Sequence, residues 1–263
     1  SLQSEEAYDT LSFEQLREDI GDRLASGAIE IAIVGDFDEE ATIDAVAATF
    51  GALPARESEF QPREEARERT FTADRETRTI THSGEADQAL IRIVWPTTDD
   101  SDHAENIRLS LLARVVQIRL QEVLREELGQ AYSPRANSSL SRTWRDYGTF
   151  NINVAVDFEQ LDAASAAIMG MIAQLRQGVK ADTVDRARAP LLERYDNLLK
   201  SLGGWMSLVD NAQSEAERLE RYFNAPDMIK AVTPDDMRDA AQTYLSPDEA
   251  VEILVVPEET LAE

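Results

Sequence analysis

The sequence predicts an α+β fold in which helices pack mainly on one face of an antiparallel sheet. Residues 147–157 alternate strictly between apolar and polar side chains, which is typical of an antiparallel strand with one buried face. Residues 88–95 form a second, strongly apolar strand pattern, and a long helical pattern follows it after a polar run. Strands that stand together and are then followed by pairs of helices favour α+β over the other layer architectures.

The long helix is expected to begin at Asp102, which forms a capping signature with Glu105, and to end at Gly129. Apolar side chains cover a wide face of this helix, so we expect it to lie within the core. The other elements expected after residue 70 are, in chain order, a moderately polar strand at 71–81, the strand at 88–95, an extended segment at 131–139, the strand at 147–157, helices at 161–176, 183–202 and 205–222 with a break at Gly203 and Gly204, a helix at 233–244 and a strand at 251–256.

Two distant parts of the chain share one helix–strand pattern. A helix cap at Ser12 corresponds to the cap at Thr233 with an offset of 221 residues, and the strand start at Ile29 corresponds to Val251 with an offset of 222. Each unit then continues as an amphipathic helix and an apolar strand. Any two helix–strand units resemble each other to some degree, so chance similarity is the alternative to a true repeat.

A true repeat would set the domain organisation. Residues 1–53 would be the terminal helix–strand–helix segment of a preceding repeat, and residues 70–258 would be one complete α+β repeat. Residues 54–69 between them hold two prolines and many charged side chains without apolar periodicity, which is typical of a solvated linker.

Composition excludes several classes of function. The chain of 263 residues has 26 basic and 51 acidic residues and a formal charge of −25, which argues against binding to nucleic acid or to an anionic membrane surface. Cysteine is absent, which excludes disulfides, thiolate zinc sites and cysteine nucleophiles. The acidic residues Asp99, Asp100 and Asp102 could hold a cation weakly, but they are more typical of a helix N-terminus.

The two histidines do not predict a metal site. His82 is followed by Glu85 and Ala86, so Ala86 stands where the second histidine of a His-x-x-Glu-His zinc motif would be. His103 lies at the expected start of the long helix, where a solvated first-turn residue is the simpler interpretation. No Gly-x-Ser-x-Gly nucleophile motif is present either.

Arg125 and Tyr132 are the candidate functional pair. Arg125 falls in the last turn of the long helix, and Tyr132 follows seven residues later, beyond Gly129. Taken by themselves, both have structural explanations, because a cation is favoured at a helix C-terminus and tyrosine is common in strands.

Three features together resemble the insulinase/pitrilysin family of zinc metallopeptidases. These are the run LREELGQAYS at 124–133, the run IVGDFDEEATIDAVAATFGALP at 33–54, and a repeat length of roughly 200 residues. The resemblance implies an α+β repeat fold whose halves close around a peptide. The family's inverted zinc motif and its distal glutamate are not matched, so the resemblance indicates the C-terminal portion, which does not bind the metal.

The resemblance also implies roles for the candidate pair. The Tyr132 hydroxyl would donate a hydrogen bond to the oxyanion that develops beside the zinc, and Arg125 would hold backbone carbonyls of the substrate. This chain is expected to hold no cofactor, and zinc is expected on the missing N-terminal half. The expected partners are that half or a zinc-bearing partner subunit, and a peptide substrate. The isolated chain is expected to be inactive, and the bacterial periplasm is favoured by analogy alone.

A non-catalytic family member is the alternative. Such a protein would lack a zinc site altogether and would act as an assembly or peptide-binding subunit. The Arg125 and Tyr132 pair weighs against it, because a scaffold has no use for an oxyanion donor. An unrelated acidic α+β domain is a third possibility, and it would lack two equivalent terminal helix–strand units.

Overall fold

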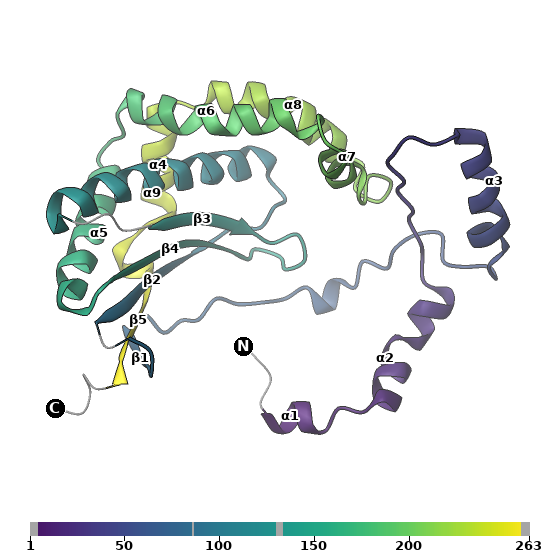
Figure 1. The fold of residues 1–263 in the computed structure, drawn as a ribbon, viewed down its shortest axis with the longest axis horizontal. Helices are drawn as coiled ribbons and strands as arrows, with labels where there is room; N and C mark the ends of the chain where they lie inside the picture. Colours follow the sequence, from purple (N-terminus) through teal and green to yellow (C-terminus); the bar gives the residue numbers. More distant parts are fainter. Residues whose placement is uncertain (1–4, 86, 130–133, 259–263) are drawn as a thin grey trace. The chain divides into compact units, whose positions relative to one another are not determined.

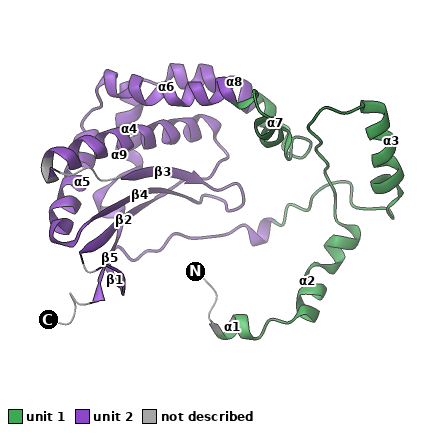
Figure 2. Cartoon of the chain, viewed as in Figure 1, with its two compact units in different colours: residues 1–63, 198–220 green, residues 64–197, 221–263 purple. Residues whose placement is uncertain are grey.

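The structure is a computed structural model that describes residues 5–85, 87–129 and 134–258. The chain divides into two compact units (Figures 1 and 2). Unit 1 consists of residues 1–63 and 198–220, and unit 2 consists of residues 64–197 and 221–263. No helix in the described part of the chain combines the length and the apolar character needed to cross a membrane.

Unit 2 is built on a five-stranded sheet, which confirms the predicted α+β class. The strands lie in the order β1 (Arg78–His82), β5 (Val251–Pro257), β2 (Gln88–Thr97), β4 (Gly148–Asp157) and β3 (Arg135–Leu140). All neighbours pair antiparallel except β1 and β5, which are parallel. The sheet is therefore mixed at one edge, where a strand from the start of the unit meets the final strand.

One face of the sheet forms the core. The β2–β4 register pairs Ile93 with Ile152 and Trp95 with Phe150, and all four side chains are fully buried. The rings of Trp95 and Phe150 meet edge to face with centroids 6.3 Å apart, and the Trp95 indole Nε1 donates a hydrogen bond to the Ser246 carbonyl at 2.9 Å. Helices α4 (His103–Leu128), α5 (Leu161–Leu175) and α9 (Pro234–Tyr244) cover this face (Figure 1).

Helix α4 lies in the middle of unit 2, as its wide apolar face predicts. The Asp102 carboxylate caps its first turn by accepting hydrogen bonds from the backbone N–H groups of Ala104 and Glu105 at 2.8 and 3.2 Å. Gly129 ends it in the left-handed conformation with φ of 67°. On the side away from the sheet lie α6 (Ala181–Leu198) and α8 (Arg218–Ala231) (Figure 1). A helix with core on both sides must be apolar around much of its circumference.

The region after α6 differs from the sequence prediction. Gly203 and Gly204 do not break the chain but lie inside α7 (Leu202–Val209), which Ser201 caps. The single helix expected at 205–222 is wrong, because the chain leaves α7 and begins α8 only at Arg218. Asn211 interrupts the helix with φ of 58°, and the Arg218 guanidinium binds the carbonyls of Ser207 and Leu208 at the end of α7.

Unit 1 contains α1 (Glu5–Asp9), α2 (Phe13–Ser26) and α3 (Glu39–Thr49). Arg56 satisfies the last carbonyls of α2, with 2.7 Å from its Nε to the Gly27 oxygen and 3.0 Å from Nη1 to the Ala25 oxygen. Neither α2 nor α3 buries a side chain. The strand expected at 29–34 is not formed in this structure, because no second strand is hydrogen-bonded to it.

The cap of α9 makes stability depend on pH. Hydrogen bonds from the Thr233 side chain and backbone lower the pKa of Asp236 below its ordinary value of 3.8. A carboxyl whose pKa is lower in the folded state stabilises the fold above its unfolded pKa, and loses this effect as pH falls through the folded pKa. We expect Asp236→Ala to lower the free energy of unfolding by about 1 kcal/mol at neutral pH. The loss should shrink as the pH is lowered from about 5 to below 3.8.

Denaturant unfolding across this pH range measures the effect, and Asp235→Ala is the matched control. Asp235 lies in the same first turn, but it makes no bond to the Thr233 cap and instead pairs with Arg238. Equal losses for both variants, or a loss that does not change with pH, would contradict the assignment.

Candidate functional site

The face of the sheet opposite α4 carries no helix of unit 2 (Figure 1). The strand register brings Val251, Val94, Asn151 and Asn137 into one row across this open face. The side of the face formed by β5 is apolar, whereas the side formed by β4 and β3 is lined by amide and hydroxyl groups. Along this row Val251, Val94 and Asn151 are at most 8% exposed, and only Asn137, on β3, is exposed.

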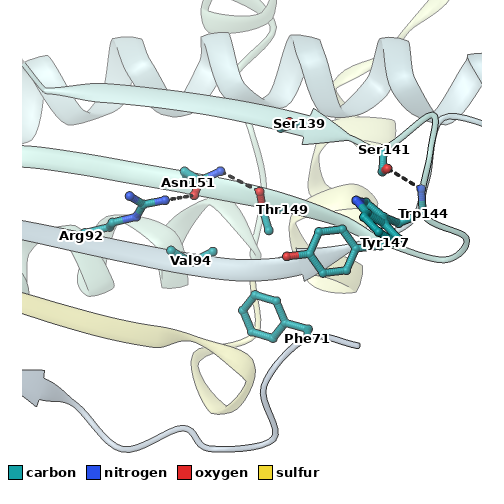
Figure 3. A pocket seen from close by; sticks show the side chains of 9 residues that line it. All are labelled: Phe71, Arg92, Val94, Ser139, Ser141, Trp144, Tyr147, Thr149 and Asn151. Carbon is teal, nitrogen blue, oxygen red and sulfur yellow. Dashed lines mark hydrogen bonds between the residues drawn. The ribbon is translucent and has the colours of Figure 1, made fainter. Parts of the chain in front are cut away.

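A pocket of about 380 Å³ opens on the polar side of this face (Figure 3). It lies between the ends of β2, β3 and β4, beside the segment that precedes β1. Its lining combines aromatic rings, hydroxyl groups, one amide and one guanidinium: Phe71, Arg92, Val94, Ser139, Ser141, Trp144, Tyr147, Thr149 and Asn151.

The floor of the pocket is a fixed hydrogen-bonded chain. The Asn151 side chain accepts a hydrogen bond from Arg92 Nη2 at 3.3 Å and donates one to Thr149 Oγ1 at 2.9 Å (Figure 3). Asn151 is only 6% exposed, so a mispaired amide would be costly there. These bonds hold the Arg92 guanidinium in a defined position on the open face.

Aromatic rings from the β3–β4 hairpin form the pocket wall. Trp144 and Tyr147 both lie against the guanidinium of Arg69, whose carbon is 5.7 and 4.7 Å from their ring centroids. The hairpin also receives the chain before β1, because the Arg145 backbone N–H donates to the Arg67 carbonyl at 2.9 Å. The second half of the segment expected as a solvated linker is therefore attached to the hairpin.

Asp100 anchors the same hairpin from the other side. Its carboxylate is 4% exposed and is 2.7 Å from Arg142 Nε and 3.6 Å from Arg221 Nη1. Its neighbour Asp99 accepts a hydrogen bond from the backbone N–H of Asp146 at 2.8 Å, and its pKa is lowered mainly by its hydrogen bond with Ser101. The acidic cluster thus organises the hairpin in addition to the start of α4.

The structure describes only one member of the predicted catalytic pair. Arg125 lies in the last turn of α4 with an exposed side chain that makes no hydrogen bond or ion pair with the described residues. Its carbonyl accepts the capping hydrogen bond from Gly129 N–H at 3.1 Å. Tyr132 lies outside the described residues, so the distance between the two side chains stays a prediction. The pocket lies at the other end of β3 from Arg125.

The histidines are occupied by backbone groups. His82 Nδ1 accepts a hydrogen bond from Gly84 N–H at 3.0 Å, and its Nε2 is 2.9 Å from the Gln88 carbonyl. His103 Nε2 is 2.9 Å from the Arg221 carbonyl. Within residues 5–85, 87–129 and 134–258, no three His, Cys, Asp or Glu side chains are grouped so that they could hold a metal ion. The described donor set therefore does not fit a catalytic zinc ion.

The sequence prediction did not identify the pocket residues. One signal was available, since the polar side of the strand at 147–157 carries Thr149, Asn151 and Asn153 instead of charged side chains. Trp144, Arg92 and Phe71 belong to three separate segments, and only the folded sheet brings them together.

Residues 10–191 match the family model described as the peptidase M16 inactive domain. The chain belongs to the peptidase M16 family. This match confirms the predicted insulinase-type membership and the assignment to a C-terminal, non-metal-binding portion. A search of curated protein sequences finds no match.

Solved structures of M16 and other proteases share the fold of this M16 chain. A protease from Helicobacter pylori matches with a TM-score of 0.76 and 11% identity, over 96% of this chain and 61% of that one. The periplasmic protease PqqL from Escherichia coli matches with 0.64 and 13%, over 85% of this chain and 25% of that one. An M16 inactive domain from Pseudomonas fluorescens matches with 0.63 and 16%, over 85% and 52%. This chain therefore spans a quarter to three fifths of these proteins.

We expect Asp100→Ala to lower the free energy of unfolding of unit 2 by about 2 kcal/mol, because it removes a buried carboxylate that bonds to Arg142 and lies near the partly buried Arg221. Thermal and denaturant unfolding measure the loss. Asp196→Ala is the control, since Asp196 is exposed on α6. Equal stability of the two variants would show that Asp100 does not anchor the hairpin.

Proposed function

We propose that this chain is the C-terminal, metal-free portion of a zinc-dependent endopeptidase. It would contribute chamber wall, peptide-binding surface and the transition-state donors Arg125 and Tyr132, while a preceding half or a partner subunit would hold the zinc. The match to the peptidase M16 inactive domain carries this proposal. The longer proteases that share its fold support it, because they leave room for a second half.

The exposure of unit 1 supports a preceding repeat. By the repeat alignment Leu16 corresponds to Met237, Ile20 to Ala241 and Leu24 to Leu245. The three residues of α2 are 53%, 41% and 69% exposed. Their three counterparts in unit 2 are fully buried. The same positions of one pattern are thus covered in the complete copy and uncovered in the other.

The segment after α2 repeats this contrast. Ile29 is 45% exposed, whereas its counterpart Val251 in β5 is 4% exposed. β5 pairs with a strand on each side in unit 2. We propose that residues 29–34 likewise add as an internal strand to the sheet of a preceding α+β repeat, and that α2 packs on that sheet as α9 does here. Residues 1–53 would then be the terminal segment of that repeat, residues 54–69 the linker, and residues 70–258 the complete repeat.

The proposed catalytic roles follow from the chemistry of the two side chains. The Arg125 guanidinium has donors free of described intramolecular partners, which leaves them available to substrate carbonyls. A phenol hydroxyl such as that of Tyr132 can donate to an oxyanion, and such a donor acts most strongly where water is excluded. Zinc on the preceding half would polarise the peptide carbonyl and activate water.

The second candidate is a family member without zinc that acts as an assembly or peptide-binding subunit. The preformed pocket on the open face favours it, because binding alone would use such a site. The upstream sequence decides between the two, since only the enzyme requires a His-x-x-Glu-His motif.

In the full-length protein we expect Tyr132→Phe and Arg125→Gln each to reduce kcat on an oligopeptide by about 100-fold, because each removes a donor to developing negative charge. Arg114→Gln is the matched control, since Arg114 is exposed three turns earlier on α4. Unchanged kcat for both variants would exclude the assigned roles. Zinc-dependent hydrolysis by the isolated chain would exclude the whole proposal.

We expect the backbone amides of α2 to be protected from hydrogen exchange in the full-length protein. In the isolated chain they should exchange rapidly, because no preceding repeat covers the apolar face of α2. Exchange measured by mass spectrometry tests this, with the amides of β4 protected in both forms. Leu16→Ser combined with Ile20→Ser should restore rapid exchange in the full-length protein, whereas Phe60→Ser, outside the repeat pattern, should not. Equal exchange of α2 in both forms would rule out a covering repeat.

A further inference from the structure

We propose that the pocket on the open sheet face binds a carboxylate of a peptide together with the aromatic or aliphatic side chain next to it. This proposal deepens the proposed function, because it rests on peptide binding by this chain and names the chemistry of the peptide. The carboxylate would come from an acidic side chain or from a peptide C-terminus, which share the same recognition.

Three arginines of this part of unit 2, of which Arg92 lines the pocket, have no carboxylate partner among the described residues. Among the described residues, Arg92 bonds only to the neutral amide of Asn151, and Arg69 contacts the rings of Trp144 and Tyr147. Arg135, on β3, forms no ion pair with the described residues. Elsewhere in unit 2 several guanidinium groups bind carboxylates, as Arg142 does with Asp100, whereas Arg114 and Arg125 on α4 have no carboxylate partner among the described residues. Within the pocket, the Arg92 guanidinium is therefore not neutralised by a described carboxylate.

The sheet register places two of these arginines in one row. Arg92 of β2 and Arg135 of β3 both lie opposite Asn153 of β4, so they are two strand spacings, roughly 10 Å, apart. The open-face positions between and beside them carry amides, hydroxyls and apolar groups. Of the open-face residues of β2, β3 and β4, only Asp157, at the end of β4, is acidic.

The position of Arg92 suits it to a carboxylate. One nitrogen bonds to buried Asn151 (Figure 3), and the remaining donors of the planar group have no acceptor among the described residues. A guanidinium binds a carboxylate through two parallel hydrogen bonds, which gives both strength and direction. Because Asn151 already orients the group, little conformational freedom is lost when an anion binds.

The other residues that line the pocket determine which side chain can bind next to the carboxylate. Phe71, Trp144 and Tyr147 present ring surface, and Val94 adds an aliphatic contact. The pocket volume of about 380 Å³ is at the low end for ligand pockets. It is enough for two short side chains but not for a large cofactor. The net charge of −25 disfavours polyanions, but a single carboxylate is acceptable beside the Arg92 guanidinium.

Titration calorimetry on the intact chain tests the proposal with three peptides of one glycine-flanked Phe-Asp sequence. The first peptide has Asp and an amidated C-terminus, and the second has Asn in place of Asp and the same amidated C-terminus. The third ends at Asn, without the following glycines, so its only carboxylate is the free C-terminus of that Asn. We expect the first, the third, or both to bind at least about tenfold more tightly than the second. The comparison of the first and third identifies the source of the carboxylate.

Variants connect the binding to the pocket. Arg92→Gln should weaken carboxylate binding at least about tenfold, Arg92→Lys should weaken it less, and Arg114→Gln should leave it unchanged. Trp144 fluorescence should respond to binding, and the response should disappear in Trp144→Phe. Thermal unfolding of Arg92→Gln, with the transition kept near that of the wild type, shows that the loss is not caused by unfolding.

Equal binding of the Asp and amidated Asn peptides, or full binding by Arg92→Gln, would overturn the proposal. Acetate that binds as tightly as the peptides would also overturn it, since the site would then be a simple anion site. The test does not involve catalysis. If no peptide binds but Arg125→Gln loses kcat, the pocket proposal is rejected and the proposed function is kept. If the carboxylate peptide binds but Arg125→Gln keeps its kcat, the proposed function alone is rejected.

Discussion

The pairing of β2 with β4 determines both faces of unit 2. The two strands pair antiparallel without interruption from Gln88 opposite Asp157 to Thr97 opposite Gly148. With a side-chain period of two residues, this one register sends Ile93 and Ile152 into the core and Arg92 and Asn153 to the open face. A slip by one residue would bury the guanidinium and expose the isoleucines. Burial of the core therefore also fixes the position of Arg92 in the pocket.

The pocket depends on polar contacts that hold the β3–β4 hairpin from two directions. Asp100 and Asp99 attach it to the start of α4, and the chain before β1 attaches to it through the Arg145 N–H and the rings around Arg69. Gly148 lets the hairpin approach closely, since a Cβ at this position would collide with the Thr98 carbonyl oxygen. Two acidic residues of this strongly acidic chain thus stabilise the hairpin that carries part of the pocket lining.

Unit 1 shows that a helix–strand pattern forms a stable layer only when it has a partner. Its α2 is capped by Ser12 and closed by Arg56, so its local sequence is sufficient for a helix. Its apolar side chains nevertheless remain exposed, and the segment at 29–34 has no strand beside it. The free energy of burying these residues would be supplied by the preceding repeat that we propose, since burial depends on area removed from water and not on local pattern.

Sequence patterns were sufficient to predict the α+β class, most elements of the complete repeat, the caps at Asp102, Thr233 and Gly129, and the family, because these depend on local periodicity, capping chemistry and short motifs. They could not determine the parallel pairing of β1 with β5 or the division of the helix expected at 205–222, which depend on contacts between distant or turn residues. The pocket forms only when the sheet is folded. Phe71, Arg92 and Asn151 are separated along the chain, and their proximity follows from strand order and register, which a one-dimensional pattern does not contain.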